Sequence, residues 1–277
     1  MKYRFLLVLL LVVSAVTAMA QTIYVEKNAL PGLSFLPGPP DTTSVDYECD
    51  VYYYEAGKLE RDTPRGEQAI IDGRYSVKHV CANFSEAFGL EISETGTPAI
   101  YKVLNNALST AALGCDRLKY VYRRPRPYQY FQEPSGSGEV DTQFAYPSGH
   151  TIRGWLTALL LTEINPGAQD ALLKRGFDYG ESRVIMGAHW QSDVEDGRMV
   201  ASTYYARLHA EQAFLNDMQA ARWEYMVLTA EDVVTEISEC PSCKSTDEGP
   251  YYTIDGRPAT PNTRGIIVSR SGKRIVP

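Results

Sequence analysis

Three short clusters of charged and hydroxyl-bearing residues stand out in this chain of 277 residues. They are, in chain order, Lys119 with Arg126-Pro127; Pro147-Ser148-Gly149-His150; and Ser182-Arg183 with His189 and Asp193. Together they supply cations, two imidazoles, a carboxylate and a turn that contains glycine. Such a set is suited to holding a phosphate-like oxyanion while an imidazole attacks its phosphorus.

The third cluster contains the predicted nucleophile. His189 and Asp193 are four residues apart, so on a helix they would share one face. A carboxylate there can accept the proton of one imidazole nitrogen and leave the other nitrogen as the nucleophile. Arg183 is six residues before His189 and would not share that face, so we expect the helix to break near Gly187. The Arg183 fork can then bind two phosphate oxygens.

The second cluster is typical of a turn that enters a helix. The first N–H groups of such a helix lack intrahelical partners and favour an anion. Ser148 adds a hydroxyl, and Gly149 allows close approach of the backbone to an oxyanion. His150 would then lie beside the anion, where it can act as a general acid toward a departing alkoxide.

The first cluster adds positive charge. Lys119, Arg126 and Arg183 together would stabilise the negative charge on a phosphoryl group in the transition state. Each cluster alone also fits a structural role, since 147–150 could be an ordinary helix start, His189 a packed core histidine and 123–126 a solvated basic loop. Only the conjunction of the three favours a phosphoryl-transfer site.

The sequence predicts that the elements that position these clusters are helices. Helical patterning or caps mark the segments 65–88, 97 to about 112 or further, 148 onward, 165–185, 193–208 and 214–228. Strand-like alternation is nearly absent between residues 60 and 228, and residues 21–47 are rich in proline and glycine. We therefore predict an all-α helical bundle preceded by an extended segment.

Both ends of the chain differ from this core. Residues 1–20 combine a basic start, a short apolar run and Ala18-Met19-Ala20, which is typical of a signal peptide. We expect the helical domain to span 21–230 and a polar linker and tail to span 231–277. The tail contains two β-prone runs around Ser-Gly, which predict a hairpin-like appendage. The mature protein is expected to be periplasmic or secreted, without stable insertion in a membrane.

Charge and cysteines exclude some functions. The net charge of −7 argues against nucleic acid as a partner. The five cysteines are Cys49, Cys81, Cys115, Cys240 and Cys243. Their pairing stays open, although a local disulfide at Cys240-Pro-Ser-Cys243 is favoured over a redox motif or half of a zinc site.

The order and spacing of the clusters resemble the type-2 phosphatidic acid phosphatase superfamily. That signature is Lys, six residues, Arg-Pro; then Pro-Ser-Gly-His; then Ser-Arg, five residues, His, three residues, Asp. Further stretches, including Phe84 to Gly89, Glu163 to Pro166 and Gly187 to Val194, are similar to the bacterial class A non-specific acid phosphatases. The likeness covers roughly residues 30–228 and implies a helical bundle related to that of the vanadium haloperoxidases.

The resemblance also implies roles for individual residues. Lys119, Arg126 and Arg183 would bind the phosphoryl oxygens with help from Ser148 and the Gly149 amide. His189 would form a phosphohistidine, Asp193 would orient it, and His150 would protonate the leaving oxygen. Phosphate monoesters are the expected substrates, and no metal or other cofactor is expected. The resemblance also suggests a homo-oligomer.

Three other functions remain open at this stage. They are a lipid phosphate or pyrophosphate phosphatase, a vanadate-dependent haloperoxidase and a non-catalytic phosphate-binding protein. The lack of further apolar segments argues against the first, and the class A stretches argue against the second. Arg153, one turn beyond His150, replaces an expected small or apolar residue, and we hypothesise that it influences substrate choice.

Overall fold

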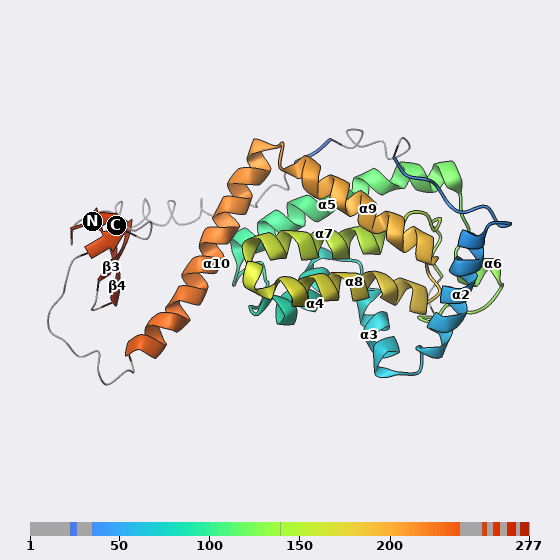
Figure 1. Ribbon diagram of the computed structural model, residues 1–277, viewed down its shortest axis with the longest axis horizontal. Helices are drawn as coiled ribbons and strands as arrows, with labels where there is room; N and C mark the ends of the chain where they lie inside the picture. Colours follow the sequence, from blue (N-terminus) through green and yellow to red (C-terminus); the bar gives the residue numbers. More distant parts are fainter. Residues whose placement is uncertain are drawn as a thin grey trace, which may run out of the picture. The chain divides into compact units, whose positions relative to one another are not determined.

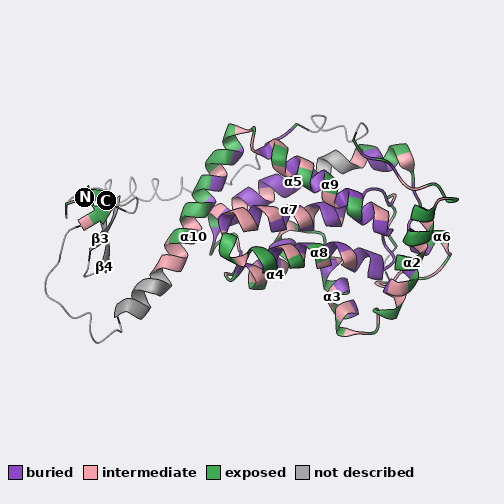
Figure 2. Ribbon diagram, viewed as in Figure 1, coloured by how far each residue is buried: buried purple, intermediate pink, exposed green. Residues whose placement is uncertain are grey.

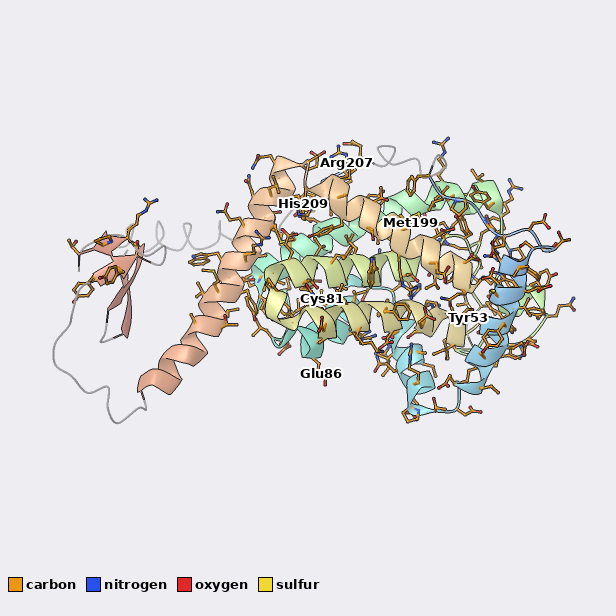
Figure 3. The ribbon with its side chains drawn as sticks, viewed as in Figure 1. Tyr53, Cys81, Glu86, Met199, Arg207 and His209 are labelled. Carbon is orange, nitrogen blue, oxygen red and sulfur yellow. The ribbon has the colours of Figure 1, made fainter. Side chains whose placement is uncertain are left out.

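A computed structural model of the chain describes residues 23–26, 35–138, 140–238, 251–253, 257–260, 265–269 and 272–276. The predicted signal peptide, Cys240 and Cys243 lie outside the described residues, as does the side chain of Cys115. Cys49, which is exposed, and Cys81, which is buried on helix α4, both carry unbridged thiols. Figure 3 labels Cys81. The chain divides into two units, Met1–Ala221 and Arg222–Pro277.

The first unit is helical, as predicted (Figure 1). Its helices, with the 3₁₀ helix η1, are α2 (Val45–Leu59), α3 (Pro64–Asp72), α4 (Val77–Phe88), α5 (Pro98–Tyr122), α6 (Pro127–Tyr130), α7 (Gly149–Ile164), η1 (Pro166–Ala168), α8 (Gln169–Ile185) and α9 (Gln191–Leu208). Helix α10 (Gln212–Ser238) begins in this unit and ends in the second.

Helix α7 lies at the centre of the bundle and packs against α4, α5, α8 and α9. Most of its length is buried, as the purple ribbon in Figure 2 shows. The α7 and α8 backbones approach closely because two glycines leave no room for a side chain between them. A Cβ on Gly154 would lie 2.4 Å from the Tyr179 ring, and one on Gly176 would lie 2.6 Å from the Ala158 Cβ. This close packing fixes the two helices that carry His150 and Arg183.

Two local departures from the sequence prediction affect the site. The segment 65–88, predicted as one helical region, is two helices, because α3 ends before Gly73 and Ser76 caps α4 by accepting from the His79 N–H. Helix α2 begins at Val45, inside a stretch predicted to be extended, and was not predicted. The turn at 73–76 and helix α2 both supply contacts to the functional site.

The second unit contains a small antiparallel sheet. Its strands are β1 (Tyr251–Thr253), β2 (Pro258–Ala259), β3 (Gly265–Ser269) and β4 (Gly272–Val276), in the order β2-β1-β3-β4. Strands β3 and β4 pair from Gly265 with Val276 to Ser269 with Gly272, which is the hairpin predicted from the sequence. The boundary expected at residue 230 falls within α10, and the two units divide after Ala221.

Candidate active site

The sequence clusters converge on one cavity of about 580 Å³ in the first unit. Six of the eight predicted site residues line it: Lys119, Arg126, Gly149, His150, Arg183 and His189. The other two, Ser148 and Asp193, are fully buried and are not among the residues that line the cavity. The lining also includes Gly73, Tyr75, Asp116 and Asp141, which sequence reasoning had not singled out.

The helix ends bring these side chains together. Lys119 lies in the last turn of α5, Arg126 caps α6, Gly149 begins α7, and Arg183 lies in the last turn of α8. The expected break near Gly187 is present, with Gly187 at a φ of +67°. The N–H groups of residues 188 and 189 then donate to the Arg183 carbonyl at 2.9 and 3.2 Å, so the loop returns His189 to Arg183.

His189 is 1 % exposed and carries the candidate nucleophilic nitrogen. Its Nε2 lies 3.1 Å from Arg126 Nη1. Because a guanidinium can only donate, Nε2 must be the accepting nitrogen and Nδ1 must hold the proton. Burial lowers the pKa of His189 well below its usual value, and the charges of Arg126, Lys119 and Arg183 lower it further. The imidazole is therefore held neutral, as a nucleophile requires.

Asp193 lies behind His189, with its Oδ2 3.4 Å from His189 Nδ1. This distance is longer than a good hydrogen bond, but catalytic hydrogen bonds without a bound substrate are often long and tighten in the complex. The Trp190 N–H donates to Asp193 Oδ2 at 2.8 Å and fixes the carboxylate at the start of α9. Asp193 is thus positioned to hold His189 by its protonated nitrogen.

A second pair of charges holds Asp193 in turn. Arg124 donates to Asp193 Oδ1 at 2.6 Å and to Asp50 Oδ2 at 2.5 Å. Asp50 also accepts from the Ser192 N–H at 2.8 Å and the Ser192 hydroxyl at 2.6 Å. Burial raises the pKa of Asp193, and Arg124 is the largest influence that opposes this rise. The network keeps a fully buried carboxylate beside its counter-ion.

Sequence analysis left open that residues 123–126 form a solvated basic loop, but Arg124 is only 7 % exposed. Its partner Asp50 lies on α2, 74 residues earlier in the chain. Nothing in the local pattern around either residue indicates their pairing. Their role depends on the packing of α2 against α9, which brings them together.

His150 lies at the start of α7 and lines the same cavity as His189. Its Nε2 lies 2.9 Å from the Gly73 carbonyl oxygen, which can only accept, so Nε2 carries a proton. Burial lowers the pKa of His150 well below its usual value, with Arg183 the next largest cause. The Tyr75 ring packs against the imidazole at 4.6 Å between centroids. The turn after α3 therefore fixes His150 with Nδ1 as its remaining nitrogen.

Arg183 and Lys119 differ in their hydrogen-bond partners. Among the described residues, the Arg183 Nε is buried without a hydrogen-bond partner, which leaves a donor for an anion. Burial and repulsion from Arg126 lower the pKa of Arg183 to about 10, so it stays charged near neutral pH. Lys119 Nζ donates to the Phe144 and Pro147 carbonyls at 2.8 and 3.0 Å. Lys119 therefore also anchors the segment before α7.

The two serines of the clusters have structural partners. Ser148 caps α7, where its Oγ accepts from the Thr151 N–H at 3.3 Å and from the Thr151 hydroxyl at 2.9 Å. Ser182 donates to Asp72 Oδ2 at 2.6 Å and accepts from Arg65 Nη1 at 2.9 Å. These contacts fasten the last residue of α3 to α8, one residue before Arg183 and beside Gly73.

The remaining histidines lie elsewhere. His79 is exposed on α4, and its Nδ1 lies 2.7 Å from the Ser76 hydroxyl. His209 follows the last residue of α9, where its Nε2 lies 3.0 Å from Glu163 Oε2. Figure 3 labels His209 at this end of α9. Neither ring lines the cavity, so His150 and His189 are the two histidines available there.

Comparison with known proteins agrees with this geometry. Residues 100–213 match the model of the PAP2 superfamily. Over 213 residues the chain is 42 % identical to a non-specific acid phosphatase of Providencia stuartii, which covers 74 % of this chain and 86 % of the relative. It is 34 % identical to a non-specific acid phosphatase of Salmonella typhimurium over 232 residues, or 81 % of this chain and 93 % of the relative.

An acid phosphatase of Zymomonas mobilis is 32 % identical over 196 residues, which are 69 % of this chain and 74 % of that protein. Within the described parts of the chain, no helix has the length and apolar character needed to cross a membrane. Because the matched residues include all three clusters and the helices that carry them, the chain is a phosphatase and belongs to the PAP2 superfamily, among the bacterial class A non-specific acid phosphatases.

Proposed function

We propose that this phosphatase hydrolyses a broad range of phosphate monoesters through a phosphohistidine at His189, without a metal ion. The observation that carries the proposal is the neutral, buried His189, whose Nε2 lies within reach of Arg126 in a cavity also lined by Lys119 and Arg183. A phosphoryl group placed there would meet a nucleophile and three cations at once.

The first step forms a bond between His189 Nε2 and phosphorus and breaks the bond from phosphorus to the ester oxygen. The His189 imidazole keeps its Nδ1 proton, and the positive charge that develops on the ring is matched by Asp193. His150 donates a proton from Nδ1 to the departing oxygen, so the product leaves as a neutral alcohol.

The second step uses the same groups in reverse. A water molecule gives a proton to His150 while its oxygen attacks phosphorus. The bond from phosphorus to His189 Nε2 then breaks, and inorganic phosphate remains among the cations. His189 is again neutral and His150 is again protonated. The His150 proton is released when phosphate leaves and is taken up again when the next substrate binds.

Cationic side chains can replace a metal ion in this scheme. The three cations lie on three different elements and line the same cavity. Across the described part of the chain, no group of three or more His, Cys, Asp and Glu residues has the arrangement of a metal site. In the proposed mechanism Lys119, Arg126 and Arg183 stabilise the transferred group by their charge.

The test is hydrolysis of a chromogenic phosphate monoester by purified protein between pH 4 and 9, with EDTA or vanadate added. We expect turnover that survives EDTA and falls with vanadate, and a phosphohistidine trapped by rapid acid-free quenching and located at His189 by mass spectrometry. His189→Ala should abolish turnover and labelling while the exposed-site control His79→Ala keeps both. Activity lost on chelation, or label on another residue, would contradict the mechanism.

We further propose that the protein is exported and that cleavage follows Ala20. This proposal depends on the composition of residues 1–20 alone. N-terminal sequencing of the protein recovered from the periplasm or the medium should begin at Gln21. Recovery of full-length chain from the cytoplasm would refute it.

A further inference from the structure

A carboxylate lies among the cations that would bind phosphate. Asp141, on the connection between α6 and α7, lines the cavity, and its Oδ2 lies 2.5 Å from Arg126 Nη2. Arg126 is 2 % exposed, whereas the Asp141 side chain is 38 % exposed. The pair thus joins a fixed, buried cation to an anion at the open side of the cavity.

The other donors of Arg126 already have partners within the protein. Its Nε donates to the Gln143 carbonyl at 2.9 Å, and Nη1 donates to the Ala188 carbonyl at 2.7 Å and lies 3.1 Å from His189 Nε2. These contacts hold the guanidinium plane in place. Nη2 is therefore the part of Arg126 available to an incoming anion, and Asp141 occupies it.

The backbone of Asp141 is anchored independently of this ion pair. Its N–H donates to the Tyr128 hydroxyl at 2.9 Å, and its carbonyl accepts from Gln129 Nε2 at 3.0 Å. Its second carboxylate oxygen, Oδ1, accepts from the Gln143 N–H at 2.8 Å. Because the backbone has its own partners, the side chain can leave Arg126 by rotation without any change in the fold of the loop.

A phosphoryl group and Asp141 would repel each other at this position. Two negative groups a few ångströms apart in a partly buried site interact unfavourably by Coulomb's law, and both need the same Nη2 donor. The binding of one must weaken the binding of the other.

From this geometry we propose that Asp141 is an internal competitor of phosphate: its carboxylate occupies Arg126 before substrate binds, gives way to the phosphoryl group, and returns to help expel inorganic phosphate. This role deepens the proposed phosphatase function, since phosphate is the product of that reaction. Asp141 would thus weaken product inhibition at the cost of a higher KM.

The opposite role is also defined by the structure. If Asp141 served mainly to orient Arg126, its removal would loosen the guanidinium and weaken the binding of phosphate. The two roles predict changes of opposite sign, so one measurement separates them.

The experiment compares the dissociation constant of inorganic phosphate in wild type, Asp141→Asn and Asp116→Asn by calorimetry on the purified protein. Asparagine keeps the shape of Asp141 and removes its charge. We expect Asp141→Asn to bind phosphate about tenfold more tightly, because one negative charge leaves the immediate surroundings of the ligand. Phosphate should inhibit its turnover at correspondingly lower concentrations.

Asp116→Asn is the matched control, because Asp116 lines the same cavity from α5 and is not an ion-pair partner of Arg126. A change of similar size in both variants would indicate a general effect of cavity charge and would overturn direct competition. Unchanged or weaker phosphate binding in Asp141→Asn would also overturn it. Asp141→Ser, which removes the charge with a smaller side chain, should show the same sign of effect if Asp141→Asn folds poorly.

Phosphate binding does not require turnover, so this test is separable from the proposed mechanism. A wild-type protein that binds phosphate but forms no phosphohistidine would refute the covalent step and leave the competition intact. Covalent turnover in the wild type, without tighter phosphate binding in Asp141→Asn, would support the covalent step and refute the competition.

Discussion

Replacing Arg124 tests whether the buried charge network behind His189 controls the reaction. Arg124→Met removes the cation between Asp50 and Asp193, which are 1 % and 0 % exposed. Removing one partner of a buried ion pair costs about 3–5 kcal/mol, because the remaining charge is left uncompensated. For a domain of this size that corresponds to a fall in Tm of roughly 6–20 °C.

The same substitution should reduce catalysis by a separate route. Burial already raises the pKa of Asp193, and the loss of Arg124 raises it further. A protonated Asp193 cannot balance the positive charge that develops on His189. We expect kcat/KM to fall about 10- to 100-fold, the range typical for partners that hold an active-site ligand in place.

The pH dependence of stability gives an internal check. In Arg124→Met, Asp193 has a folded-state pKa above its unfolded value of about 3.9, so the folded state binds more protons and loses stability as the pH rises. The difference in Tm between wild type and variant should therefore narrow as the pH falls from 7.5 to 5. Circular dichroism melts over this range measure it.

Two further variants separate stability from catalysis. Asp50→Asn combined with Arg124→Met removes one of the two uncompensated carboxylates, so it should recover part of the Tm but little of the activity. Arg123→Met removes the neighbouring, exposed arginine and should change neither the Tm nor the activity by much. The reasoning is refuted if Arg124→Met keeps kcat/KM within about twofold of wild type and its Tm within about 2 °C.

Three further outcomes are expected. The activity lost at alkaline pH should fall away at a higher pH in log kcat than in log kcat/KM. The reason is that burial and Arg183 lower the pKa of His150 before substrate binds, and the phosphoryl charge raises it afterwards. The pH profiles of both constants measure this difference. Gly73→Ala should raise KM several-fold with little change in kcat, since its Cβ would lie 3.0 Å from Arg183 Nη1; steady-state kinetics with one ester test it. Arg153→Ala should alter relative rates across a panel of esters, because Arg153 lies 3.6 Å from the centroid of the Tyr75 ring that lines the cavity and donates to the Tyr75 carbonyl; unchanged ratios would contradict it.

The sequence was most informative where caps and apolar periodicity coincide. Thr97-Pro98 marks the start of α5, and the 148–150 turn marks the start of α7. Helix α2 escaped detection because its buried face is formed by Asp50, Tyr54 and Gly57 rather than by an apolar stripe. Periodicity counts Asp50 as polar, yet it is buried because Arg124 compensates its charge. A helix stabilised through a buried ion pair gives no hydrophobic signal.

The residues of the site also differ in whether the sequence could predict them. The groups that face the cavity could be predicted, because they form a fixed pattern in three clusters. The groups that hold them could not, because Gly73 meets His150 across 77 residues of sequence and Asp50 meets Arg124 across 74. A backbone carbonyl also leaves no trace in residue identity. Ser148 belongs to both groups, since its place in a cluster predicts phosphate binding and its hydroxyl oxygen also accepts from Thr151 at the start of α7.

The charges of the cavity connect substrate binding to proton transfer. Arg183 and Arg126 are among the groups that lower the pKa of both histidines, so both imidazoles are neutral before substrate binds. A phosphoryl group reduces that positive field at His189 and at His150 alike. In the proposed mechanism His189 would then attack phosphorus with its lone pair, whereas His150, held at Nε2 by the Gly73 carbonyl, would take up a proton at Nδ1. If this mechanism holds, the same cations keep the nucleophile unprotonated and let the general acid take up its proton only when an anion is present.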